Sequence, residues 1–309
     1  MIIAGKKHLL VKPLIRARRE QALTLQCTCK LCDDQRMYPI LTGLLAIVLY
    51  LVASSLLTIR LVQAPAAGTC QRKQAFICAG AAVLIHGILL YPLILTGSGL
   101  NLGFFNAASL ISLTTALLLL LAAFVEPVEN LGIPVFTLAA LMIALQLAYP
   151  EQQIITGSTT SWQLQGHILI SLLAYSILGL AALQSILLAI QDYHLRNRSP
   201  GGFIRALPPL QTMESLLFQM IGVGFVLLSL ALLSGILFLE DIFAQHLVHK
   251  STLSIAAWVV FALLLWGRWR FGWRSRVAIR WTLWGYVFLM LAYFGSKFVL
   301  ELVLNTRQG

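Results

Sequence analysis

Eight long apolar runs are the feature of this chain that most constrains its fold. They lie at roughly 39–62, 75–95, 104–123, 131–148, 166–190, 217–239, 252–267 and 282–305. A helix needs about 20 apolar residues to cross the hydrocarbon core of a bilayer, and the runs approach or exceed that length. Hydrophobic residues make up 59% of the 309, a composition unsuited to a water-soluble surface. The sequence predicts an all-α polytopic membrane protein, a bundle of about eight transmembrane helices.

The positions of lysine and arginine predict how this bundle is oriented. Among the connections after the second, fourth and sixth runs, Lys250 is the only lysine or arginine. The connections after the first, fifth and seventh runs are rich in arginine. Arginine-rich connections are usually cytoplasmic, so both termini are expected outside. The net charge of +11 therefore indicates membrane orientation and not nucleic-acid binding. The basic residues of these three connections are Arg60, Arg72, Lys73, Arg196, Arg198, Arg205, Arg268, Arg270, Arg274, Arg276 and Arg280.

The basic head, residues 1–36, conflicts with this orientation because it would lie outside. It lacks the apolar segment of a signal peptide, and Met37 stands directly before the first run. We therefore expect Met37 to be the natural start and residues 37–309 to form the helix bundle. The alternative is a genuine head in which "CTCKLC" forms part of a zinc site.

The chemistry of this chain is expected to depend on histidine. The sequence contains no P-loop, HExxH, GxSxG or CxxCH motif, so no catalytic residue and no dedicated metal site is predicted. His86 lies in the middle of the second run, in "VLIHGILLYP". An ionisable group at such depth usually faces the bundle interior and is a functional candidate. The alternative is a neutral imidazole hydrogen-bonded between helices.

A second histidine, His167, begins the fifth run and would lie at the outer membrane surface. Ser171 and Tyr175 follow at intervals of four residues and share its helical face. This polar stripe favours a binding function over a solvated helix end.

The residues that precede and begin the seventh run form a third group. His249 would lie at the depth of His167, and two outer imidazoles could act as axial ligands of a haem held edge-on. Lys250 would then pair with a haem propionate, or else remain solvated. Trp258 shares a helical face with Lys250 and would pack inside the bundle, against a neighbouring helix or a porphyrin.

Taken in order, these residues resemble the cytochrome c assembly (CcsA-type) membrane family, in particular its HemX/YpjD-like inner-membrane branch. The resemblance runs from about residue 37 to the C-terminus. It rests on "IHGILL", "GHILISLLAYS", "HKSTLSIAAWVVFALLLWGRWRFGWRSR" and "LAYFGSKFVLELV". It implies a bacterial inner-membrane location and haem binding or transit by histidines, His86 within the membrane and His167 at its outer surface.

The chain departs from that family at two places. The tryptophan-rich motif of the full synthetases is replaced by "LEDIFAQHLVHK", and Leu304 stands where those enzymes carry a second outer histidine. The resemblance therefore implies haem binding without synthetase activity, with His249 as a replacement ligand.

We accordingly expect a haem-handling accessory of cytochrome c assembly or haem metabolism that is not itself an enzyme, with haem b as cofactor. Its partners would be the lipid bilayer, haem and proteins of cytochrome c assembly or haem synthesis. Two alternatives remain open. One is a transporter of a small solute or metal ion, with His86 and Lys297 lining its path. The other is a membrane regulator of a haem-synthesis enzyme that acts through the arginine-rich connections.

Overall fold

A computed structural model describes residues 38–62, 69–96, 99–150, 162–197, 207–238 and 245–295, with the backbone alone described at 69–70, 95–96, 99–100, 238 and 245–250. Within these ranges, eight helices are long and apolar enough to cross a membrane, which confirms the predicted all-α bundle. The basic head, Lys297 and Leu304 lie outside the described residues. The start at Met37 therefore stays a prediction.

The helices follow the eight apolar runs. They are an N-terminal helix (Tyr38–Val62), α2 (Thr69–Ile94), α3 (Phe104–Ala122), α4 (Gly132–Ala148), α5 (Trp162–Arg196), α6 (Leu210–Phe238), α7 (Gln245–Phe271) and α8 (Ser275–Met290). A 3₁₀ turn, η1 (Glu129–Leu131), precedes α4, and a π-helical segment, η3 (Leu291–Gly295), continues α8. Two short strands, β1 (Leu95–Thr96) and β2 (Gly99–Leu100), form an antiparallel pair between α2 and α3.

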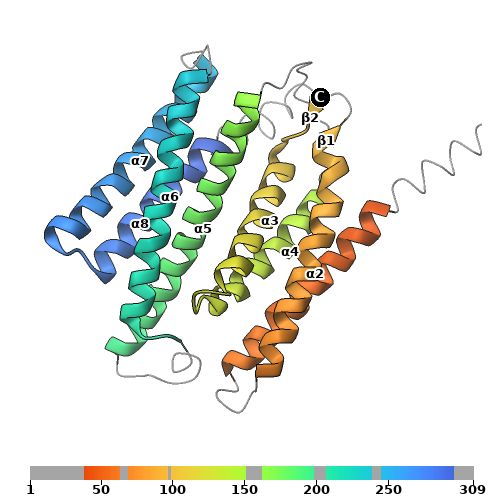
Figure 1. The fold of residues 1–309 in the computed structure, drawn as a ribbon, viewed down its shortest axis with the longest axis horizontal. Coiled ribbons are helices and arrows are strands. Elements are labelled where there is room, and N and C mark those ends of the chain that lie inside the picture. Colours follow the sequence, from red (N-terminus) through yellow and green to blue (C-terminus); the bar gives the residue numbers. More distant parts are fainter. Residues whose placement is uncertain are drawn as a thin grey trace, which may run out of the picture.

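The bundle consists of two groups of helices that meet at α5. The N-terminal helix, α2, α3 and α4 lie on one side of α5, and α6, α7 and α8 lie on the other (Figure 1). Each group has its own hydrophobic core, and α5 contributes to both. Leu180 packs into the first core and Leu178 into the second. These two residues point in nearly opposite directions, because residues two apart on a helix differ by about 200°.

Several helices are longer than their apolar runs. α5 extends to Arg196, and α7 and α8 leave only residues 272–274 between them. The prediction that these arginines lie in a loop after the seventh run is therefore mostly wrong. Four of them lie in the end turns of α7 and α8: Arg268, Arg270, Arg276 and Arg280. Backbone hydrogen bonding continues a helix past the hydrocarbon boundary wherever the residues tolerate it. Gly272, with φ of 65°, supplies the left-handed conformation that ends α7.

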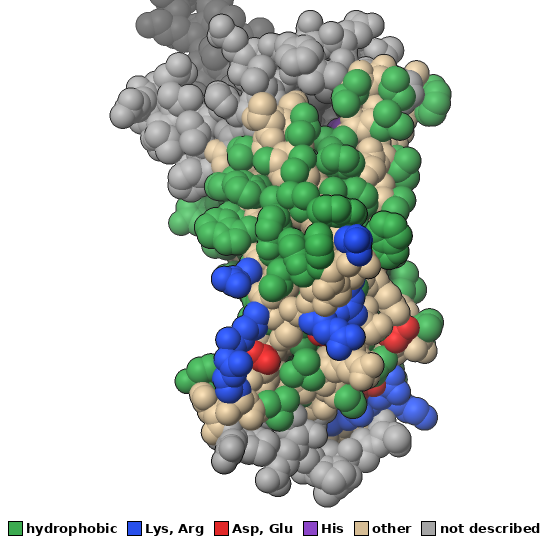
Figure 2. All heavy atoms as spheres, turned by 90° about the vertical axis from the view of Figure 1, so that its left-hand side faces the viewer, with side chains coloured by type: hydrophobic (Ala, Val, Ile, Leu, Met, Phe, Trp, Pro, Cys, Tyr) green, Lys and Arg blue, Asp and Glu red, His purple; other side chains and the backbone are tan. Residues whose placement is uncertain are grey.

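The described arginines of the three basic connections gather at one end of the bundle, which we call the arginine end. This common placement was predicted, and Figure 2 shows Lys and Arg gathered in the lower part of one face, below an apolar band. Ion pairs link helices there. Glu129 pairs with both Arg60 and Arg72, and Arg268 donates to Glu214 over 2.6 Å.

Close packing of α5 against α6 depends on one of the small residues of α6. A Cβ on Gly224 would approach Leu178 Cδ2 to 2.6 Å, so a larger residue there would displace the Leu178 side chain. Gly222 has open space beside it and makes no comparable contact.

Candidate functional site

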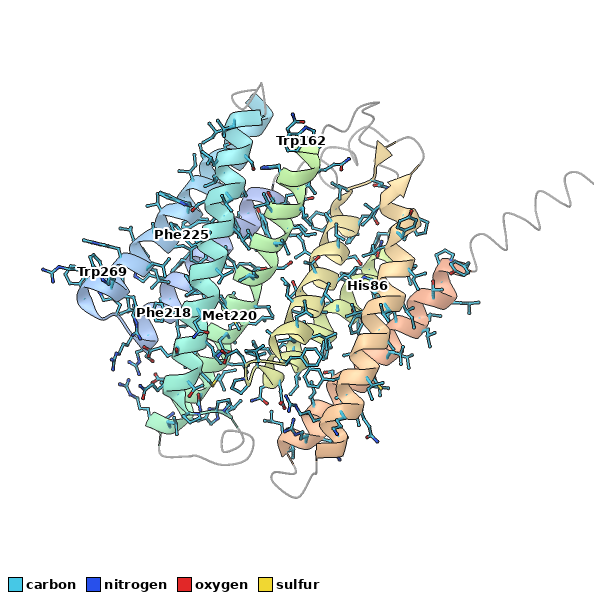
Figure 3. All side chains as sticks on the ribbon, viewed as in Figure 1. His86, Trp162, Phe218, Met220, Phe225 and Trp269 are labelled. Atoms are coloured by element: carbon cyan, nitrogen blue, oxygen red, sulfur yellow. The ribbon has the colours of Figure 1, made fainter. Side chains whose placement is uncertain are left out.

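His86 is fully buried inside the first group of helices (Figure 3). Its Nε2 lies 2.9 Å from Ser109 Oγ of α3, and its Nδ1 lies 3.4 Å from the Tyr50 hydroxyl of the N-terminal helix. One tautomer satisfies both contacts: the tyrosine donates to Nδ1, and a protonated Nε2 donates to the serine. The imidazole thus connects three helices. This is the arrangement expected if His86 is a neutral histidine hydrogen-bonded between helices, the alternative that the sequence left open.

The surroundings of His86 seal it from any ligand of appreciable size. Tyr50 and Ser109 have no exposed surface, and the Tyr50 ring stacks on Phe136 of α4 with centroids 5.9 Å apart. Nearby on α3, Asn106 accepts a 2.9 Å hydrogen bond from Gln146 Nε2 of α4. The polar side chains of this group therefore pair mainly with one another, and neither ring nitrogen of His86 faces a cavity.

His167 differs from His86 in burial and in bonding. It lies near the first turn of α5, is half-buried, and places Nδ1 2.9 Å from Ser234 Oγ of α6. Gly235 of α6 lies beside the ring, since a Cβ there would lie 3.4 Å from His167 Cε1, an ordinary van der Waals distance. Nε2 has no partner among the described residues.

The second hydrogen bond of the Ser234 hydroxyl favours one tautomer of His167. That hydroxyl also lies 2.9 Å from the Ala231 carbonyl, which accepts its single proton. Nδ1 is then the donor to Ser234, and Nε2 carries the lone pair. Metal-bound histidines show this same arrangement, with one ring nitrogen held by a hydrogen bond and the other free to coordinate.

Tyr175 shares the predicted face of His167 but contacts another helix. Its hydroxyl donates to the Leu289 carbonyl over 2.8 Å, just before the π-helical segment η3. A π-helical turn shifts the usual backbone pairing and leaves carbonyl groups for side-chain donors. Tyr175 also packs edge-on against Tyr293, with centroids 5.8 Å apart. The tyrosine hydroxyl therefore connects α5 to α8.

Trp258 is partly buried and packs against the second core, and its polar group has a partner. The indole Nε1 donates to Ser229 Oγ over 2.8 Å, and the ring stacks on Phe225 with centroids 5.4 Å apart. Both contacts are with α6. They match the prediction that Trp258 packs against a neighbouring helix, and its role beside a porphyrin stays a prediction.

The remaining predicted ligands, His249 and Lys250, have side chains outside the described ones. Of the predicted site residues that are described, the structure brings none into contact with another: His86, His167, Tyr175 and Trp258 each contact different neighbours. Within the described ranges no group of three or more His, Cys, Asp or Glu side chains could hold a metal ion. The donor set fits a single axial imidazole, His167, better than a protein-enclosed metal site.

Sequence reasoning missed the partners of these residues. Tyr50 and Ser109 complete the His86 contact, and Ser234 orients His167. Ser109, Ser234 and Tyr50 lie within apolar runs, where nothing in the local sequence marks them as partners of a histidine. Only contacts between helices distant in sequence reveal their roles.

Comparison with known proteins identifies the family of this chain. The family model described as "Cytochrome C assembly protein" matches residues 74–304. The chain belongs to the cytochrome c assembly protein family. It is 36% identical over 263 residues to "Inner membrane protein YpjD" of Escherichia coli strain K12, a match that covers 84% of this chain and 98% of that protein. The family resemblance of the sequence is therefore confirmed, and the chain is a multi-pass inner-membrane protein.

More distant members of the cytochrome c assembly family also match. "Cytochrome c biogenesis protein CcsA" of Porphyra purpurea is 24% identical over 201 residues, which cover 53% of this chain and 62% of that protein. The CcsA protein of Synechococcus strain CC9902 is 26% identical over 189 residues, covering 54% and 61%. The matched family segment includes His86 and His167, on which the expected haem chemistry depends.

Proposed function

We propose that this member of the cytochrome c assembly family binds or passes on haem b as an accessory protein and is not itself an enzyme. The observation that carries the proposal is the state of His167. Its Nδ1 is held by Ser234 and its Nε2 carries a lone pair without a described partner. Neutral imidazole in this arrangement is a suitable axial ligand for haem iron, which would supply the redox-active group.

The two histidines have different roles in this proposal. His167 ligates iron, and His86 stabilises the first group of helices through Tyr50 and Ser109. His249 and Lys250, which begin the seventh span, remain the proposed second ligand and propionate partner. Each of these residues can be varied on its own.

The experiment compares the haem content of protein purified from haem-replete cells. His167→Ala should lose most of the Soret absorbance, because the ligand is removed while the fold keeps its cores. His194→Ala is the matched control, since His194 lies at the opposite end of the same helix and should leave the absorbance unchanged. Wild-type haem content in folded His167→Ala, or wild-type protein that contains no haem, would contradict the proposal.

A membrane regulator of a haem-synthesis enzyme is the second candidate, and the arginine end favours it. Arg270, Arg274 and Arg280 are exposed and form no ion pair with a described acidic residue. Unpaired guanidinium groups can bind carboxylates of a partner. Substitution of these three by glutamine should then abolish capture of the partner without any change in haem content.

A further inference from the structure

Two acidic residues fix the turn between α7 and α8 to the neighbouring helices. Arg268 of α7 donates to Glu214 of α6 over 2.6 Å, and Glu214 also accepts a 3.3 Å bond from the backbone N–H of Ser275, which begins α8. Arg276 of α8 donates to Asp192 of α5 over 3.3 Å. Two of the five arginines of this turn and its flanking helix ends are thereby paired.

The other three arginines of this segment are exposed and have no acidic partner among the described residues. The connections after α4 and α6 contain further acidic residues, but both helices begin at the arginine end, so these connections leave from the opposite end of the bundle (Figure 1). The head, residues 1–36, is itself net basic. The counter-charge therefore comes from outside the described residues. The three arginines are Arg270, Arg274 and Arg280.

Tryptophan is concentrated beside these arginines. Five of the seven tryptophans of the chain fall within residues 266–284. Trp269 is 83% exposed and Trp284 is 61% exposed, and Figure 3 shows Trp269 directed away from the bundle. Tryptophan is enriched where a membrane protein meets the headgroup region, because its ring is apolar and its N–H is polar. The exposed rings therefore indicate that this surface lies at headgroup depth.

The surface around α7 shows the same depth relation between charge and apolar side chains. Figure 2 views the bundle from the side on which α7 lies, and Lys and Arg gather there directly below an apolar band. In a multi-pass inner-membrane protein, such a band contacts lipid tails, and side chains just beyond it contact headgroups. A guanidinium group matches a phosphate, to which it can donate two parallel hydrogen bonds.

We propose that Arg270, Arg274 and Arg280 bind the phosphate groups of anionic phospholipids, with Trp269 and Trp284 in the glycerol region beside them. The lipid has a net negative charge, as phosphatidylglycerol does, because the ammonium group of a zwitterionic lipid would repel the unpaired arginines. The site shares no residue with the proposed haem site. It uses the same arginines as the regulator hypothesis, but its partner is the bilayer and not a protein.

The test measures quenching of intrinsic tryptophan fluorescence by lipids brominated near the carboxyl end of the acyl chain. Five of the seven tryptophans lie beside the three arginines, so the signal reports mainly on this surface. The full chain would be reconstituted into phosphatidylcholine vesicles that contain brominated phosphatidylglycerol or brominated phosphatidylcholine. Wild type should reach the same quenching at a roughly fivefold lower mole fraction of the brominated phosphatidylglycerol. High salt should reduce this preference.

Two double variants of equal charge change locate the preference. Arg270→Gln with Arg280→Gln should lose most of it. Lys73→Gln with Arg196→Gln also removes two exposed charges from the arginine end, but outside α7 and α8, and should keep it. All four side chains are exposed and form no ion pair with a described residue, so both variants should fold.

Three outcomes would overturn the proposal. Equal quenching of wild type by the two brominated lipids would leave the arginines to a protein partner. A full preference in the Arg270→Gln and Arg280→Gln variant would remove them from the lipid site. An equal loss in the Lys73→Gln and Arg196→Gln variant would show that the preference depends on total charge and not on this surface. None of these outcomes bears on the haem proposal, because no haem is added.

Discussion

His86 and His167 are two histidines of one membrane protein with opposite surroundings. His86 is fully buried, and both of its ring nitrogens have partners from other helices. His167 is half-buried and bonded through Nδ1 alone among the described residues. The deeper histidine thus connects helices through both nitrogens, and the more peripheral one has no described partner at Nε2. The predicted role of His86 as a haem ligand stays a prediction, and its two hydrogen bonds between helices give it a structural role as well.

The largest expected effect is a difference in stability between variants of the two histidines. His86→Ala should lower the free energy of unfolding by about 2–4 kcal/mol, because it leaves a cavity and removes the partner of two buried hydroxyls. His167→Ala should lower it by less than about 1 kcal/mol, since the ring is half-buried and makes one such bond. Thermal unfolding of both variants in the same detergent measures the difference. Equal losses would show that the two sites do not differ in this way.

The next effect concerns the orientation of His167. Ser234→Ala should weaken haem binding roughly 10- to 100-fold, as expected when the hydrogen bond that orients a metal-ligating histidine is removed. Ser185→Ala is the control, because Ser185 also donates to a carbonyl three residues earlier but contacts no histidine in the described structure. Haem titration followed by absorbance gives both affinities. The same affinity in the two variants would remove Ser234 from the site.

A smaller effect tests the contact between α2 and α3. Ser109→Ala should cost about 1 kcal/mol of stability, since it leaves one nitrogen of His86 unpaired. Ser112→Ala should cost less, because that hydroxyl bonds only to the Ser109 carbonyl of its own helix. Thermal unfolding of the pair measures the difference, and a greater loss for Ser112→Ala would contradict the assigned role of Ser109.

The smallest effect examines Trp258. Trp258→Phe removes the donor to Ser229 but keeps an aromatic ring beside Phe225, so stability should fall by about 0.5–1 kcal/mol. Haem content should not change if the residue only packs against α6. A marked loss of Soret absorbance in a variant of nearly normal Tm would instead place Trp258 next to the porphyrin.

More of the fold than of the candidate site could be predicted from the sequence. Length and hydropathy specify helices that cross a membrane, so the eight spans were predictable. The helix ends were not, because Arg268 and Arg276 continue helices outside the apolar runs. The roles of Tyr50 and Ser234 depend on which helices are neighbours, and periodicity along one run carries no information on that choice.

The most direct test of the account is chemical rescue at the two histidines. His167→Gly and His86→Gly proteins would each be supplied with haem, first alone and then with free imidazole, and the Soret band recorded. The account predicts that imidazole restores the band in His167→Gly, because the added ring replaces the missing iron ligand. It predicts no imidazole-dependent band in His86→Gly. Rescue of His86→Gly without rescue of His167→Gly would contradict the account.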